Sequence, residues 1–497
     1  MNKILKSIIV TSLVIFATNC VNAIENKPLE IKTETNVADL DMVIKDNFIK
    51  SKFSSAENKF IQSNIKASYS DFNDIIQKAK HDDYVLLLYG IKISEYGFFD
   101  LSESLIQKLD NNIYTKNYAN EIRKFYYPSS IVKEKDYLLL ADAYSNIVYN
   151  NMAIETTSEL INSTRIDDSD YKDFLISLGY YKSNDIQQAL KYINQAIQQN
   201  DNNVNYMLLK AKILADANKS KQALKLIAKI KKLNFKTVDF QNKILATEEY
   251  VLYKISKLDT IKDYHLAYYY HLQGKSLLAT KVLQTALIQA KQNSSDIYSL
   301  LGKIYYDNNE LAKAKEFSMR AYKENHQNDI AILTLANLNY EEMNYKEALK
   351  FYKKAKHSEI QSQIGIANSL LGLQKEEKSK KIYEKMLKKH TNNEDLLIDS
   401  LQLYPQKADE YLPKIASMDL SNNDIWLNLA NLSIRDNNYK MAITHLNNSY
   451  YLDTNNFKYY YYLSLVLRAK GDIELANKSL IKCSRLNSDY ATEMKSE

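Results

Sequence analysis

The chain has 497 residues, more than one hydrophobic core usually holds, so it folds as several domains or as an elongated repeat. Only 8 Gly and 4 Pro are present, which argues against sheet-based and dinucleotide-binding folds, because these use both residues in turns and phosphate loops. The formal net charge of +6 is too small for this length to indicate nucleic-acid binding.

Residues 1–23 have the pattern of an export signal. Lys3 and Lys6 form a basic start, an apolar run follows from Ile8 to Ala17, and Ala23 ends the segment at a position that suits cleavage. We therefore expect a protein that is exported to the periplasm or secreted. An uncleaved signal that anchors the chain in the inner membrane is the alternative, although the apolar run is short for a membrane span.

The chain has two cysteines, Cys20 and Cys483, and their positions matter for how an exported chain is anchored and stabilised. Lipid attachment at Cys20 is a third possibility, but Asn19 stands where a small residue is expected. Cleavage after Ala23 leaves Cys483 as the single thiol and excludes an intramolecular disulfide. Cys483 occupies a small-residue position of the repeat described below, which predicts a buried structural cysteine.

The segment 24–82 follows the signal and has two parts. Residues 24 to about 36 are polar and contain Pro28, which is typical of a flexible segment that leads into the folded part. Residues 37–82 look helical but do not follow the repeat, so we expect an N-terminal helical cap.

From residue 83 onward, small residues recur with spacings of 12 and then 7. The clearest two copies lie 34 residues apart and consist of Gly302, Ala314 and Ala321, followed by Ala336, Ala348 and Ala355. A small residue midway along one helix lets the next helix cross closely, so the spacing predicts pairs of helices joined by short turns. Gly and Asn at these turns suit the left-handed helix-end conformation, as at Gly274, Gly471, Asn344 and Asn438.

The period of 34 and the small positions resemble the tetratricopeptide repeat, and ten units fit between about 83 and 489. The resemblance implies an all-α protein, an α-solenoid with a right-handed superhelix of helix–turn–helix repeats behind the signal peptide, of the kind found in exported bacterial proteins. The copies divide the chain into irregular repeats at 83–258 with an extra helix near 238–258, a regular block at 259–390, a degenerate repeat at 391–422 with Pro405 and Pro413, and a C-terminal pair at 423–490.

Candidate chemistry is sparse. The seven His residues form no compact metal-ligand spacing, and no phosphate-binding loop or nucleophile motif is present. We expect no enzyme activity, no cofactor and no metal site, and no small-molecule substrate is evident. The basic stretch 375–389 interleaves Lys with Glu and favours a solvated helix face over a patch that binds acidic partners.

In the resembled family, the first helix of each repeat lines a concave groove that takes peptides. Carried over position by position, the groove candidates are Lys303, Tyr306, Asn337, Tyr340, Asn368, Asn428 and Asn431, with Tyr181 and Lys212 further upstream. Three of the asparagines directly follow the first small residue, where an amide can pair with a peptide backbone. These three asparagines either form a row that binds a peptide backbone or share this position by chance, because Asn is abundant in this chain. The family's carboxylate-clamp pattern is not reproduced, which argues against recognition of a free chaperone C-terminus.

The resemblance implies a scaffold that binds a peptide or partner protein in the groove, and the signal at 1–23 implies that it is exported. The small net charge gives no reason to expect nucleic-acid binding. One alternative is a structural component of a cell-envelope assembly or secretion complex, with peripheral association to the envelope. The other is a secreted factor that acts on another cell.

Overall fold

The computed structural model describes residues 48–129, 134–289, 294–356 and 359–487. Every regular element in these ranges is a helix, which confirms the predicted all-α class. The expected signal peptide at 1–23 and the lead that follows it lie outside the described residues. None of the described helices is long and apolar enough to cross a membrane.

The chain divides into two compact units. Unit 1 is made of Asn218–Lys232 and Gln241–Tyr411. Unit 2 contains the described residues of Glu30–Ala217, Leu233–Phe240 and Leu412–Glu497. Two of the boundaries between them fall in turns, at 217/218 and 232/233, and two fall inside helices, at 240/241 in α14 (Val238–Ile255) and at 411/412 in α24 (Ala408–Met418).

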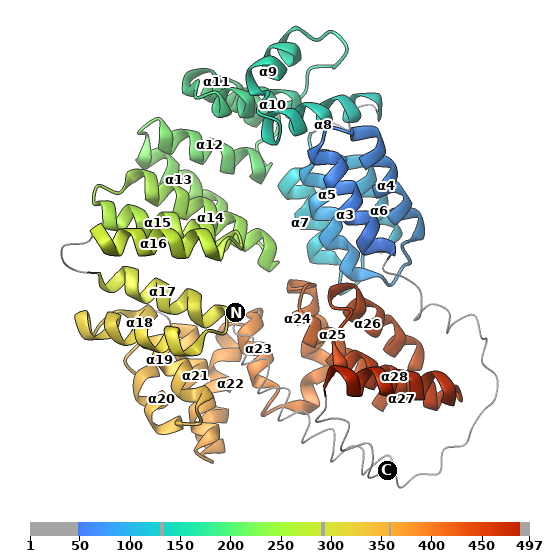
Figure 1. Cartoon of the computed structure of the whole chain (residues 1–497), viewed down its shortest axis with the longest axis vertical. Helices are drawn as coiled ribbons and strands as arrows, with labels where there is room; N and C mark the ends of the chain where they lie inside the picture. The colour runs from blue at the N-terminus through green and yellow to red at the C-terminus, as the bar shows by residue number, and fades with distance from the viewer. Residues whose placement is uncertain (1–47, 130–133, 290–293, 357–358, 488–497) are drawn as a thin grey trace. The chain divides into compact units, whose positions relative to one another are not determined.

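Unit 1 is a stack of consecutive antiparallel helix pairs, coloured green to orange in Figure 1. Its helices are α13 (Ser220–Lys231), most of α14 (Val238–Ile255), α15 (Asp259–Leu272), α16 (Ser276–Gln289), α17 (Ser295–Asp307), α18 (Leu311–Glu324), α19 (Asp329–Glu341), α20 (Tyr345–Tyr352), α21 (Glu359–Gly372), α22 (Glu376–Lys389), α23 (Glu394–Ser400), the 3-10 helix η3 (Pro405–Lys407) and the start of α24 (Ala408–Met418). The helix α14 occupies the interval in which an extra helix was expected.

Unit 2 contains the remaining elements. They are α3 (Phe48–Ile61), α4 (Ile65–Lys78), η2 (Tyr84–Leu86), α5 (Leu87–Glu95), α6 (Phe99–Lys108), α7 (Lys116–Tyr126), α8 (Glu134–Val148), α9 (Ala153–Asn162), α10 (Asp170–Lys182), α11 (Ile186–Gln199), α12 (Val204–Asp216), the end of α24, α25 (Asn423–Arg435), α26 (Tyr439–Leu452), α27 (Phe457–Ala469) and α28 (Ile473–Leu486). The helix α7 was not expected.

The small residues of the repeat lie where paired helices touch. A Cβ atom on Gly302 would come within 3.0 Å of the backbone nitrogen of Ser318 and 3.3 Å of the carbonyl oxygen of Ala314 on the partner helix. Where serine takes a small position, its hydroxyl bonds across the pair, as from Ser379 to the carbonyl oxygen of Ala367 at 2.8 Å. The predicted helix–turn–helix repeat is thereby confirmed, because close backbone approach needs small side chains there.

The first described pair, α3 and α4, shows the same contact. The Ser68 hydroxyl donates to the carbonyl oxygen of Ala56 at 2.8 Å. These residues are 12 apart, which is the spacing that the repeat uses. This pair therefore packs in the manner of the later pairs, a likeness that the search for a 34-residue period did not detect.

The turns between paired helices differ in one detail from the prediction. Gly274 and Gly471 adopt positive φ angles of 74° and 87°, as expected for a left-handed helix end. At the other two turns the left-handed residue lies one position earlier, at Met343 with φ 59° and Asn437 with φ 57°. Asn438 instead accepts a hydrogen bond from the backbone nitrogen of Met441 at 3.2 Å, so this asparagine caps the start of α26.

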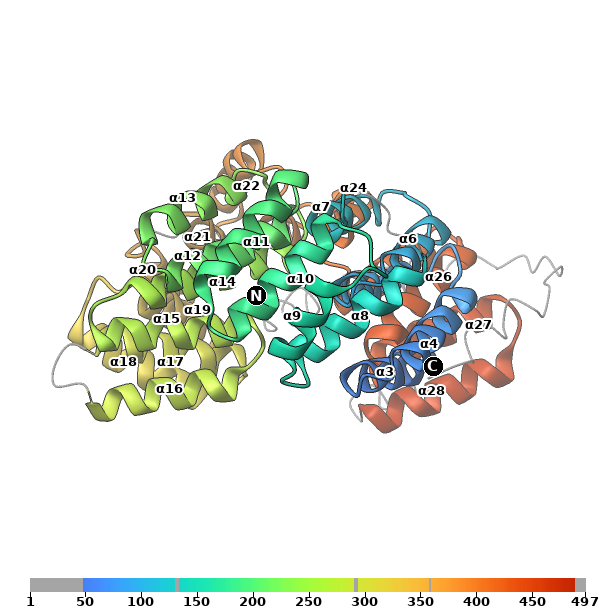
Figure 2. The same ribbon diagram turned by 90° about the horizontal axis from the view of Figure 1, so that it is seen from above.

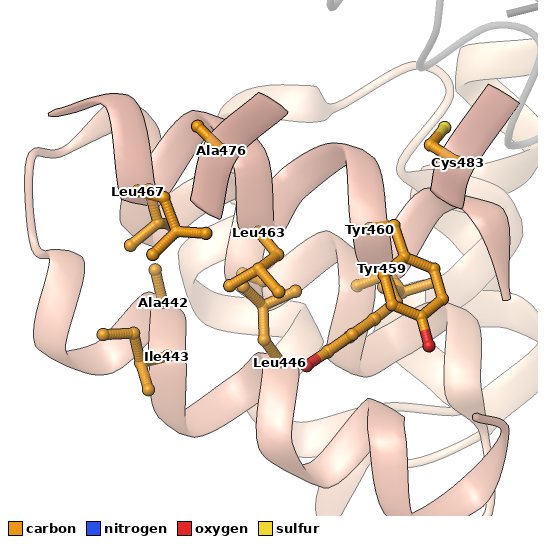
Figure 3. Close-up of a cluster of buried hydrophobic side chains, with 12 residues drawn as sticks. Ala442, Ile443, Leu446, Tyr459, Tyr460, Leu463, Leu467, Ala476 and Cys483 are labelled. Carbon is orange, nitrogen blue, oxygen red and sulfur yellow. The ribbon is translucent and has the colours of Figure 1, made fainter. Parts of the chain in front are cut away.

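The core of the C-terminal pair is drawn in Figure 3. Tyr459 and Tyr460 of α27 are both buried, with Leu463 on the same helix and Leu446 on α26. Cys483 of α28 is fully buried beside them, as predicted for a structural cysteine. Burial raises the pKa of its thiol to about 11, which keeps the thiol protonated and unreactive.

Unit 2 also joins segments that are far apart in the sequence, as the blue and red helices of Figures 1 and 2 show. The Lys50 ammonium donates to the carbonyl oxygen of Leu452 at 3.2 Å. The backbone nitrogen of Val85 donates to Oδ1 of Asn448 at 3.0 Å. The Asn448 amide donates in turn to the carbonyl oxygen of Asp82 at 2.9 Å.

An aromatic cluster lies at this junction. Trp426 of α25 is fully buried and stacks on Tyr84, with ring centroids 6.1 Å apart. Tyr114 lies 5.7 Å from the same indole. His445 packs against both Trp426 and Tyr114, and burial lowers its pKa to about 3, so the imidazole stays neutral. Unit 2 is therefore held together by contacts between its first and last helices, and not by sequence neighbours alone.

Candidate peptide-binding site

A pocket with a volume of about 290 Å³ lies in unit 1 against the first helices of successive pairs. The helices α15, α17, α19, α21 and α23 follow one another along this face, since each contacts the next first helix. Each of them contributes side chains to the wall, and Tyr352 of α20 completes it. We call this cavity the unit 1 pocket.

The unit 1 pocket brings together five of the seven groove candidates. Its walls include Lys303 and Tyr306 from α17, Asn337 and Tyr340 from α19, and Asn368 from α21. These residues share one face because positions related by the repeat period point in the same direction in a regular stack.

The other two candidates do not reach this pocket. Asn428 and Asn431 are half-buried on α25, which belongs to unit 2. The upstream positions Tyr181 and Lys212 also lie in unit 2, on α10 and α12. The candidates thus fall into two units.

The two asparagines of the pocket are engaged by tyrosines from second helices. The Tyr352 hydroxyl donates to Oδ1 of Asn337 at 2.6 Å, and the Tyr383 hydroxyl donates to Oδ1 of Asn368. In both pairs the tyrosine lies 15 residues after the asparagine. Asn368 is only 2% exposed, so the position after the first small residue contributes to packing within the repeat.

A glycine lets Tyr352 approach so closely. A Cβ atom at Gly365 would collide with the Tyr352 ring, so only glycine allows the ring to lie flat against α21. There the hydroxyl reaches Asn337 on the neighbouring helix α19. Gly365 thereby shapes the wall of the unit 1 pocket, which it also lines.

One end of the pocket holds a compensated group of charges. The Lys303 ammonium lies 2.6 Å from Oδ2 of Asp307, and Nε2 of His271 lies 3.0 Å from the same oxygen. Burial alone would raise the pKa of Asp307, but the contacts with His271 and Lys303 outweigh it and hold the pKa at about 2. Asp307 is therefore ionised and balances the charge of Lys303.

Beside this group, the hydroxyl of the lining residue Tyr306 reaches a carboxyl group. Its hydroxyl contacts Oε1 of Glu341, while Oε2 of Glu341 has no hydrogen-bond partner in the described part of the chain. Burial raises the pKa of Glu341 to about 7, although the hydrogen bond from Tyr306 acts in the opposite direction.

The opposite end of the pocket contains a residue that the sequence analysis missed. Asp399 of α23 lines the cavity, is 2% exposed, and its Oδ1 atom makes no hydrogen bond within the described residues. Burial raises the pKa of its carboxyl well above the usual value, and the nearby Asp395 adds to the shift, whereas a hydrogen bond with Asn368 opposes it. The available signal was an acidic residue directly after the apolar run Leu396–Ile398 in the degenerate repeat.

Comparisons with known proteins give a distant likeness in fold. No family model and no curated protein matches the chain. Among solved structures, the chain is similar to one in the crystal structure of the APC/C hetero-tetramer Cut9–Hcn1, with 12% identity, coverage of 87% of this chain and 92% of that one, and a TM-score of 0.43. It is also similar to the human IFIT1 dimer with PPP-AAAA, with 11% identity, coverage of 86% and 94%, and a TM-score of 0.29.

At this distance, the function has to be argued from the residues of the pocket. Tyrosine rings, amides and carboxyl groups from five successive first helices and α20 surround one cavity. Rings offer apolar and π contacts, whereas amides and carboxyls offer directional hydrogen bonds. Such a lining can hold a side chain of a segment that lies along the stack.

Proposed function

We propose that this protein is an exported scaffold that binds a segment of a partner protein on the face of unit 1 containing the pocket. The observation that carries the proposal is the convergence of Lys303, Tyr306, Asn337, Tyr340 and Asn368 on one cavity. In this proposal the protein is not an enzyme, uses no cofactor and does not bind nucleic acid.

The half-buried residues of the pocket support this proposal. Tyr268, Lys303, Leu333 and Asn337 all line the pocket and each keep part of their surface accessible. Interfaces commonly combine such aromatic and polar side chains around a depression. The repeated first helices also present these groups in a row, which suits an extended or helical segment.

The proposal is tested by comparing how much partner is captured by the unmodified chain and by a variant whose pocket is blocked. Leu333→Arg places a long charged side chain at the wall of the pocket, so we expect the variant to lose the proteins that the full chain captures after crosslinking in the cells that make it. Met319→Arg on α18 is the matched control, because Met319 is exposed and does not line the pocket. If both variants keep the helical circular dichroism spectrum of the parent chain, equal capture by Leu333→Arg and the unmodified chain would show that the pocket face does not bind the partner.

Export is a separate part of the proposal and rests on residues 1–23. We expect the protein in the periplasm or the medium, with an N-terminus at Ile24. Fractionation followed by N-terminal sequencing decides this. A chain that stays in the cytosolic fraction and begins at Met1 would contradict export, whereas a membrane-bound chain with an intact signal would support the anchored alternative.

A second candidate function is docking into an envelope assembly through the exposed face of α16, which is the second helix of its pair. On α16, Leu277 is 88% exposed and Ile288 is 87% exposed. Three helical turns separate these residues, so both side chains project from one side of the helix. Replacing both by Ser would release the protein from envelope material if this surface docks, and would leave its fractionation unchanged if it does not.

A further inference from the structure

The unit 1 pocket contains a buried carboxyl group that lacks a countercharge. Asp399 forms no ion pair with any Lys, Arg or His of the described residues, and its Oδ1 atom has no hydrogen-bond partner there. Buried polar atoms in folded proteins nearly always have a partner, and an unpaired one costs stability. An unpaired acceptor at the wall of a cavity therefore points to a donor that arrives with a ligand.

Two neighbouring hydroxyl donors already have acceptors. The Tyr352 hydroxyl donates to Asn337, and the Tyr383 hydroxyl donates to Asn368. Asn368 holds Asp399 through its own amide. Neither hydroxyl can turn to Asp399 without releasing an asparagine, so the surrounding repeat positions the carboxyl group but does not satisfy it.

The lysine of the pocket is committed as well. The Lys303 ammonium lies 2.6 Å from Oδ2 of Asp307, at the end of the cavity formed by α15 and α17, and Nε2 of His271 lies 3.0 Å from the same oxygen. Asp395, one helical turn before Asp399, also lines the cavity and adds negative potential. Among the described residues that line the pocket, Lys303 is the one basic side chain, and it is engaged at the other end of the cavity.

Four tyrosines complete the lining of the pocket: Tyr268, Tyr306, Tyr340 and Tyr352. The face of a tyrosine ring attracts a cation, and its apolar surface packs against the methylene stem of a lysine or arginine. An acidic end with aromatic walls is a suitable environment for a long basic side chain.

We propose that the unit 1 pocket binds one basic side chain, lysine or arginine, of the partner segment, with its charged head on the carboxylate of Asp399. This inference rests on the proposed function, because it names the feature of the segment that the groove recognises. The carboxylate and the arriving cation satisfy each other at a buried position, where charge-assisted hydrogen bonds are strong.

The experiment uses the full chain and a displayed library of random 12-residue peptides. Peptides that bind the full chain and are lost on Leu333→Arg are the pocket-dependent binders. We expect them to share one lysine or arginine, and we expect replacement of that residue by norleucine to weaken binding about tenfold or more. Lysine and arginine versions of one peptide show which head group the pocket prefers.

The variant Asp399→Asn keeps the shape of the side chain and removes its charge. We expect it to weaken the basic peptide about tenfold or more and to leave the norleucine peptide unaffected, since a double-mutant cycle isolates the pair. Glu316→Gln on α18 is the matched control for net charge, because Glu316 is exposed and outside the pocket, and we expect no effect. If Asp399→Asn fails to fold, the norleucine comparison on the unmodified chain decides.

The outcomes separate the two proposals. Pocket-dependent binders that share no basic residue, or that bind Asp399→Asn as tightly as the unmodified chain, would overturn the basic-side-chain inference and leave the groove in place. A library without any binder that depends on Leu333 would overturn both.

Discussion

At the scale of single residues, two wall tyrosines of the unit 1 pocket are positioned by contacts with Gly365 and Glu341. Gly365 has no side chain where the Tyr352 ring lies, and this close approach lets the Tyr352 hydroxyl reach Asn337 at 2.6 Å. Glu341 is held beside Tyr306 in a partly buried position that favours its protonated form. We therefore expect substitution of Gly365 to change the stability of unit 1, and substitution of Glu341 to change its pH dependence.

The substitution Gly365→Ala forces the Tyr352 ring away from α21 and breaks its bond to Asn337. We expect the free energy of unfolding of unit 1 to fall by about 1–3 kcal/mol, the usual range for overpacking. Gly90→Ala is the control, since the nearest side-chain atom to a Cβ there is 3.5 Å away and alanine favours helix. Urea melts of both variants measure this, and equal stability of Gly365→Ala and the parent chain would contradict the packing described.

The raised pKa of Glu341 predicts a pH dependence. The folded state holds this proton up to about pH 7, whereas the unfolded state releases it near 4.5, so folding gains from protonation at low pH. The contribution of Glu341 to stability should therefore decline as the pH rises from about 4.5 to about 7 and stay level above. Thermal melts across this range should show a shallower decline for Glu341→Gln than for the parent chain. Identical slopes would show that Glu341 titrates normally in the folded protein.

At the scale of helices, small residues set the distance between partners in each pair. Ser379 of α22 is fully buried, and its hydroxyl donates to the carbonyl oxygen of Ala367 on α21 at 2.8 Å. The same position tolerates a smaller side chain but has no space for a larger one.

We expect Ser379→Ala to cost about 1 kcal/mol, the usual worth of one hydrogen bond, while Ser379→Leu costs about 1–3 kcal/mol and separates the two helices. Hydrogen exchange should then speed up in both α21 and α22 for the leucine variant only. Loss of protection confined to α22 would mean that the pair does not depend on this contact.

The spacing of small residues was enough to predict most of these helix pairs, because contact between backbones restricts residue type directly. It did not reveal α7, which stands between two pairs without a copy at the repeat period. It also missed the likeness of α3 and α4 to the later pairs, since one pair alone shows a spacing of 12 but no period of 34. The repeat period also grouped the groove candidates, and five of the seven line one cavity.

Asp399 could not be predicted in the same way. Its significance depends on Asn368 from another repeat and on the lack of an ion-pair partner within the described part of the chain, and neither is visible in a local pattern. Likewise, Asn368 appeared to be a groove residue by its position, whereas the structure engages its amide with Tyr383 and Asp399.

At the scale of the whole molecule, unit 2 does not behave as a simple linear array. Trp426 is fully buried between Tyr84 and Tyr114, and its indole nitrogen donates to the carbonyl oxygen of Leu420 at 3.0 Å. In a linear array each repeat depends on its sequence neighbours only. Here helices from the two ends of the chain share one core.

We therefore expect Trp426→Ala to destabilise unit 2 by about 3–5 kcal/mol, the usual cost of removing a large buried aromatic side chain. Hydrogen exchange should speed up in η2 and α5 as well as in α25 and α26. Faster exchange limited to α24–α28 would contradict the shared core.

Whether the pocket face of unit 1 holds the partner can be measured by site-specific photo-crosslinking in the producing cells. A photoreactive phenylalanine is placed at Tyr268 of the pocket, or at Tyr322 of α18 as a control. Both sites carry a half-buried tyrosine, so the substitutions are matched. We expect a crosslinked partner from position 268 and none from position 322. A partner that crosslinks from position 322 but not from position 268 would contradict binding on the pocket face.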